Sequence, residues 1–129
     1  MASARFQVFT RCSTDGRNNG SAKRHAGSVT WRFLSANNRS IGRSVSDFPD
    51  GEACVSALLD LQKVLPGSSV VTVRDELGLW VWRLRVDRSD VAMSTRCYQR
   101  RLHAENAGSA FRDLAATVRD IDELQVVHF

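Results

Sequence analysis

Two stretches of the chain carry apolar residues at the spacing of an amphipathic helix. The apolar positions follow i, i+3, i+4, i+7 and i+11, so that one face of each helix would point toward a core. They are Cys54, Ala57, Leu58, Leu61 and Leu65 in the first stretch, and Ala107, Ala110, Phe111, Leu114 and Val118 in the second. Pro66-Gly67 ends the first helix, because proline cannot continue it. The pattern predicts two helices, each with one buried face.

Short segments rich in β-branched and aromatic residues predict strands. Three such segments precede the first helix, three precede the second, and one follows it. They run from Arg5 to Arg11, Val29 to Ala36, Ser40 to Val45, Val70 to Arg74, Leu79 to Val86, Asp90 to Thr95, and Leu124 to Phe129. Asn37-Asn38 and Asp87-Arg88-Ser89 lie where tight hairpins need residues that tolerate positive φ. The predicted order is βββα twice, followed by one strand.

The two βββα stretches also resemble each other in sequence. Trp31-Arg32-Phe33 aligns with Trp82-Arg83-Leu84. Further along, Ile41, Ser44 and Phe48 align with Val91, Ser94 and Tyr98, with one residue of slippage. We interpret the chain as a single domain, 1–129, with one repeat at 4–66, a second at 68–120 and an extra strand at 122–129.

The first of these stretches contains a distinctive motif. Trp31-x-Phe33 is followed by Ala36-Asn37-Asn38-Arg39-Ser40-Ile41, then by Ser44 and Phe48. This run resembles the signature of the YegP-like proteins, a family of tandem or dimerised short repeats of unknown function. The resemblance covers most of residues 28–65 and, more loosely, 79–118. It implies two βββα units that share one antiparallel sheet and exchange strands; it implies no enzymatic activity and supplies no catalytic residues.

Packing considerations lead to the same architecture. One three-stranded meander with one helix cannot cover its own apolar face, whereas two such units can form a continuous sheet beneath two helices. We therefore predict an α+β fold with two tandem βββα repeats. They form one mostly antiparallel sheet, with both helices packed on one face.

Alternation along the strands predicts which side chains lie on the face that the helices leave open. If the aromatic-rich positions point inward, the buried set is Phe6, Val8, Trp31, Phe33, Trp80, Trp82, Leu84, Val91 and Met93. The opposite set contains Gln7, Phe9, Leu34, Val81, Ala92 and Ser94, together with six arginines: Arg5, Arg11, Arg32, Arg83, Arg85 and Arg96. No acid occupies an interior position of this set, because Asp75, Asp87 and Asp90 fall at strand ends or turns.

The charge of the chain agrees with a basic surface. The 129 residues include 18 Lys and Arg against 14 Asp and Glu. All the cations except Lys23 and Lys63 are arginine, whose planar guanidinium can bind a carboxylate or phosphate with two hydrogen bonds. Residues 12–28 are dense in Gly, Ser, Asn and basic side chains, so we expect a mobile basic loop with Arg17, Lys23 and Arg24 as candidate contacts.

The arginine-lined face allows three interpretations. It could be a solvated face, in which arginine stems cover apolar neighbours. It could bind single-stranded nucleic acid or RNA, although only one aromatic is available for stacking. It could contact an acidic protein or a second copy of this chain. We predict a small non-enzymatic binding module that uses this face and the basic loop, with nucleic-acid binding as the alternative.

Other residues offer little chemistry. Cys12 and His25 are too few for a closed zinc site, and we expect no metal and no cofactor. Cys97 could approach His103, which we expect on the apolar stripe of the second helix, and this pair is the one hint of an enzyme. We see neither a signal peptide nor an apolar run long enough to cross a bilayer, so we expect a cytoplasmic protein without membrane contact.

Overall fold

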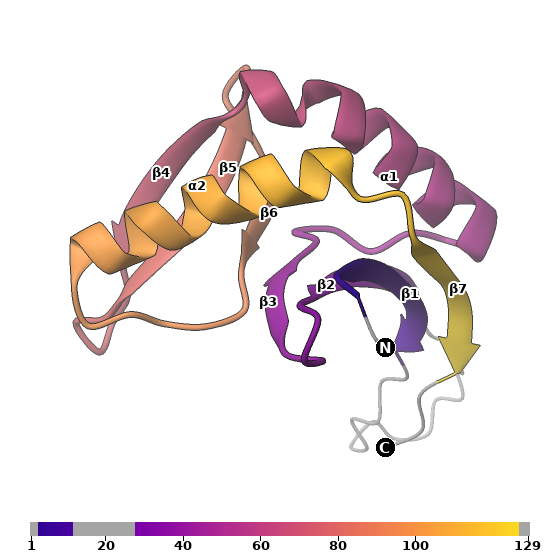
Figure 1. Cartoon of the computed structure of the whole chain (residues 1–129), viewed down its shortest axis with the longest axis horizontal. Coiled ribbons are helices and arrows are strands. Elements are labelled where there is room, and N and C mark those ends of the chain that lie inside the picture. The colour runs from indigo at the N-terminus through magenta and orange to yellow at the C-terminus, as the bar shows by residue number, and fades with distance from the viewer. Residues whose placement is uncertain (1–2, 12–27, 127–129) are drawn as a thin grey trace, which may run out of the picture.

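The computed structural model describes residues 3–11 and 28–126 (Figure 1). Its strands are β1 (Arg5–Arg11), β2 (Ser28–Leu34), β3 (Ser40–Arg43), β4 (Ser69–Arg74), β5 (Trp80–Val86), β6 (Ser89–Ser94) and β7 (Ile121–Val126). The helices are α1 (Gly51–Val64) and α2 (Arg101–Thr117), and a short 3-10 turn, η1 (Leu65–Gly67), follows α1. The order βββα therefore occurs twice before β7. We call β1–β3 with α1 the first half, and β4–β6 with α2 the second half.

All seven strands belong to one sheet. Their order is β4-β5-β6-β3-β2-β1-β7. Strands β1 to β6 pair antiparallel with their neighbours, whereas β7 runs parallel to β1. The halves meet where β3 pairs with β6, with Gly42 opposite Ser94 and Arg43 opposite Met93. The α+β class and the mostly antiparallel sheet are confirmed, while the repeat boundaries at 4–66 and 68–120 stay a prediction.

Local sequence explains where the hairpins and the first helix begin. Asn38, Asp87 and Arg88 adopt positive φ, as the turn residues predict. The side chain of Asp50 caps α1 by accepting a hydrogen bond of 2.8 Å from the backbone N–H of Ala53, which satisfies a donor that has no partner within the helix.

Both helices lie on the same side of the sheet (Figure 1). The core between the helices and the sheet contains Phe6, Val8, Trp31, Phe33, Trp82 and Leu84 from the sheet, with Leu58 and Phe111 from the helices. The Phe111 ring packs 4.9 Å from Trp82 and 5.3 Å from Phe33, measured between ring centroids. Neither helix is long and apolar enough to cross a membrane, within the described part of the chain.

The predicted alternation along β6 is wrong after Val91. Val91 packs against the core as expected, but Ala92 and Ser94 are buried on the helix side and Met93 lies on the open side. A shift in register between Leu84 and Arg85, the signature of a β-bulge, moves the alternation by one residue. Small residues fit inward here because aromatic rings fill the space above the two central strands. A Cβ atom on Gly42 would lie 2.8 Å from Phe111 Cε1.

The buried face of α2 also differs from the prediction. Its buried residues are Ala104, Gly108, Phe111 and Ala115, whereas Ala110 and Leu114 are exposed. The helix lies so close to the sheet that a Cβ on Gly108 would come within 2.8 Å of Val70 Cγ1. Of the predicted stripe, Phe111 is buried and Ala107 and Val118 pack against the core. The prediction misses the small residues that this close packing requires. In the sheet, Trp80 is predicted to be buried, but it is half-buried and lies outside the core.

Candidate interaction surface on the open face of the sheet

The strand register aligns one row of side chains across the face that lies away from the helices. Gln7 lies opposite Arg32, and Arg32 lies opposite Arg43. The row continues through Met93 to Arg83 and ends at Val71 on the edge strand β4. Because directly opposite residues share a face, the guanidinium groups of β2, β3 and β5 all belong to this row.

Side chains of the first half hold Arg32 in place. Its Nε donates a hydrogen bond of 2.6 Å to Gln7 Oε1, and its Cζ lies 5.0 Å from the centroid of the Phe9 ring. This part of the face is largely closed, since Phe9 is 8% exposed, Leu34 5% and Thr30 3%. The only aromatic predicted for the open face therefore presents little surface for stacking.

In the second half, two arginines share one carboxylate. Arg83 Nη1 lies 3.1 Å from Asp90 Oδ2, and Arg85 Nε lies 2.9 Å from Asp90 Oδ1. The expectation that this face carries no acid is wrong, because the bulge places Asp90 opposite Arg85. The hydrogen bond from Arg85, followed by that from Arg83, holds the pKa of Asp90 below its ordinary value despite partial burial.

Arg43 on β3 belongs to this surface, and sequence reasoning missed it. It is half-buried between Arg32 and Met93 in the row, and no hydrogen bond from its side chain is recorded among residues 3–11 and 28–126. A second register shift, between Phe33 and Leu34, causes the oversight. Ile41 and Gly42 both lie against the core, so simple alternation from Ile41 misplaces the next residues.

Apolar side chains continue the surface on β4 and β5. Val71 lies opposite Arg83, and Val73 lies opposite Val81. These three valines and Met93 are half-buried. We call the set Arg32, Arg43, Arg83, Arg85, Met93, Val71, Val73 and Val81 the arginine–valine surface.

The remaining predicted arginines contribute less. Arg5 donates hydrogen bonds to Asn38 Oδ1 and to the Ser3 carbonyl oxygen, at 2.7 and 3.1 Å. Arg96 is exposed beyond the end of β6 at Ser94, so its predicted place on the sheet is wrong. The side chain of Arg11 and the loop residues Arg17, Lys23 and Arg24 lie outside the described residues.

The cysteine and histidine candidates do not form a recognisable catalytic arrangement. Cys97 Sγ lies 3.7 Å from Asp75 Oδ2. His103 is exposed on α2, so its expected place on the apolar stripe is wrong. Burial in the core raises the pKa of the Cys54 thiol to about 11, which keeps it protonated. The described residues contain no cluster of three His, Cys, Asp or Glu able to hold a metal ion.

Two solved structures have a similar architecture. The chain is similar to the solution structure of the protein of unknown function yegP from E. coli, with a TM-score of 0.66 at 11% identity. That similarity covers 100% of this chain and 98% of the E. coli chain. The chain has the YegP-like fold.

A second structure with the YegP-like fold supports the same assignment. This is a UPF0339 protein from Shewanella oneidensis, with a TM-score of 0.67 at 10% identity. The similarity covers 96% of this chain and 92% of the other. No protein family matches the sequence, and no curated protein matches it.

Proposed function

We propose that this protein is a non-enzymatic binding module whose arginine–valine surface takes an acidic patch of a partner protein. The charge balance supports the proposal most strongly. The side chains of β1–β6 on this surface include four guanidinium groups, those of Arg32, Arg43, Arg83 and Arg85, against one carboxylate, that of Asp90, which pairs with Arg83 and Arg85 alone. The surface therefore keeps a positive charge that an acidic partner would neutralise.

The apolar part of the surface favours a protein partner. Arginine and methionine are enriched in protein interfaces, where apolar side chains form the desolvated centre. Val71, Val73 and Val81 lie beside the cations on β4 and β5. Single-strand binders instead present several aromatic rings for base stacking, and on this face Phe9 is 8% exposed beneath Arg32. Pairing of the surface with a second copy would bring arginine against arginine.

The test uses Arg43→Glu, since this change reverses a charge without removing a recorded hydrogen bond. Full-length protein is titrated with poly-L-glutamate at low and high salt. We expect the variant to bind about fivefold more weakly or worse at low salt, because attraction becomes repulsion. Added salt should weaken binding by the original protein.

The matched control is Arg101→Glu, an equal charge change at an exposed position of α2, which should alter affinity less than about twofold. Equal losses in the two variants would show attraction by net charge alone and contradict the proposal. Tighter binding of polyuridylate than of poly-L-glutamate at matched salt would assign the surface to nucleic acid instead.

A further inference from the structure

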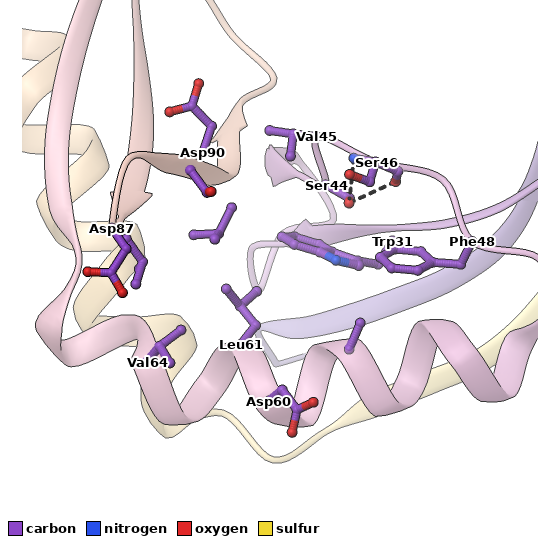
Figure 2. A pocket seen from close by; sticks show the side chains of 14 residues that line it. Trp31, Ser44, Val45, Ser46, Phe48, Asp60, Leu61, Val64, Asp87 and Asp90 are labelled. Atoms are coloured by element: carbon purple, nitrogen blue, oxygen red, sulfur yellow. Dashed lines mark hydrogen bonds between the residues drawn. The ribbon is translucent and has the colours of Figure 1, made fainter.

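A cavity of about 530 Å³ lies on the helix side of the first half, away from the arginine–valine surface (Figure 2). Its walls come from α1, from the segment between β3 and α1, and from the β5–β6 hairpin. The interior is formed mainly by Trp31, Phe48, Leu61, Val64 and Val91. The lining also includes three serines and three aspartates. A cavity of this volume with aromatic and aliphatic walls is typical of sites for small molecules.

Trp31 supplies an unused hydrogen-bond donor in this cavity. The residue is 2% exposed, and its indole and the Phe48 ring both line the cavity (Figure 2). Among the residues that the structure describes, no hydrogen bond from its Nε1 is recorded. Buried indole N–H groups usually have a partner, so a ligand with an acceptor at its buried end would complete this one.

Two exposed carboxylates belong to the lining of the cavity. Asp60 on α1 and Asp87 in the β5–β6 turn are both exposed lining residues, and neither has an ion pair within the described ranges. Asp90 also lines the cavity, but its carboxylate is bound to Arg83 and Arg85 and is turned away (Figure 2). The lining contains no Lys, Arg or His. The lining thus favours a cation.

We propose that this cavity binds a small organic cation with an aromatic body and a hydrogen-bond acceptor at the end opposite its positive charge. The acceptor meets the Trp31 N–H, and the body packs against Phe48, Leu61 and Val91. The charged end lies between Asp60 and Asp87. Arylalkylamines with a ring hydroxyl have this chemistry. The proposal does not rest on the proposed function, because none of the residues assigned to these contacts belongs to the arginine–valine surface.

The test titrates ¹⁵N-labelled full-length protein with tyramine and follows the indole N–H signals of the three tryptophans. Trp31→Phe identifies the Trp31 signal. We expect that signal to shift with a dissociation constant of about 1 mM or tighter, as is typical of a ligand this small. Three analogues test each contact: phenethylamine lacks the acceptor, tyrosol lacks the charge, and 3-(4-hydroxyphenyl)propionate reverses it.

Substitutions in the protein test the same contacts as the ligand analogues. Ala57→Phe should fill the cavity, since Ala57 lies in its wall. The double variant Asp60→Asn/Asp87→Asn should weaken tyramine binding about threefold to tenfold, because two charge contacts are lost. The double variant Glu76→Gln/Glu105→Gln removes equal charge at exposed sites outside the cavity and should leave binding unchanged.

The proposal stands if tyramine shifts the Trp31 signal and binds more tightly than all three analogues. It is overturned if the Trp31 signal does not move, or if tyrosol and the propionate bind as well as tyramine. If Ala57→Phe fails to fold, the two double variants decide: equal affinity in both contradicts the placement of the cation.

Discussion

The two halves of the sheet contain the same succession of strands, but their open faces differ in how far the side chains are exposed. On the open face, the first half buries Phe9, Leu34 and Thr30 almost completely. The second half keeps Val71, Val73, Val81 and Met93 partly exposed there. An equal arrangement of strands therefore does not give equal surfaces, and the partly exposed apolar side chains of this face are concentrated in the second half.

The helix side shows the reverse difference. In the second half, Phe111 of α2 packs against Trp82 with ring centroids 4.9 Å apart, and Gly108 brings the helix close to that ring. In the first half, Leu61 of α1 and Trp31 both line the cavity. The second half thus combines a tight helix interface with partly exposed side chains on the open face. The first half combines a looser helix interface with buried side chains on that face.

The largest expected effect comes from disrupting the tight helix interface of the second half. Phe111→Ala should lower the free energy of unfolding by about 4 kcal/mol, because the ring is buried and the change leaves a cavity between Trp82 and Phe33. Urea unfolding measures the change. Leu114→Ala is the control, since Leu114 is 41% exposed and should cost less than about 1 kcal/mol. Similar losses in both variants would contradict the observed register of α2.

A smaller effect is expected where the halves meet. Gly42→Ala places a methyl group 2.8 Å from Phe111 Cε1 and 3.2 Å from Trp82 Cη2. Those rings are held in the core, so we expect a loss of about 2 kcal/mol in thermal or denaturant unfolding. Gly67→Ala adds the same methyl group with nothing within 4 Å and should be neutral. A neutral Gly42→Ala would show that the junction is not closely packed.

The smallest expected effect on stability comes from a substitution on the open face of the second half. Asp90→Asn removes the carboxylate that Arg83 and Arg85 share. Stability at neutral pH should fall by no more than about 1 kcal/mol, because both arginines are more than a third exposed and water screens the pair. Affinity for poly-L-glutamate should rise, since the surface gains net positive charge. Weaker binding by this variant would contradict the proposed role of the surface.

The same pair gives a pH dependence with a defined sign. The pKa of Asp90 is lower in the folded chain than its ordinary value of 3.8, so the pair stabilises the fold above that value. This contribution is lost as the pH falls through the folded pKa. Thermal unfolding of the original protein should therefore approach that of Asp90→Asn below about pH 4. A difference that persists in acid would show that Asp90 acts by packing and not by charge.

Most of the fold can be predicted from the sequence because its signals are local. Turn residues such as Asn38 and Asp87 require positive φ, and both adopt it. The helical spacing of Cys54, Leu58 and Leu61 correctly identifies the buried face of α1. On α2 the same spacing finds Phe111 but misses Ala104, Gly108 and Ala115, since these contacts depend on small residues that pack against other elements.

Breaks in the strand alternation explain the misplaced residues of β3 and β6. A β-bulge adds one residue to a strand, and every later side chain then changes face. Such irregularities occur beside Leu34 and Arg85. They place Arg43 and Met93 on the open face, where strict alternation from Ile41 and Val91 would put them against the core, and they bring Asp90 opposite Arg85. The shifts lie in the pairing of β2 with β3 and of β5 with β6, and the alternation of apolar and polar residues does not reveal them.

Chemical-shift mapping tests the central claim most directly. The backbone amide signals of full-length protein are followed during titration with poly-L-glutamate at low salt. We predict that the largest shifts cluster at Arg43, Val81, Arg83 and Met93, with little change at the exposed helix residues Arg101 and Glu105. Shifts that cluster on α2, or that spread evenly over all basic positions, would contradict the assignment of this surface.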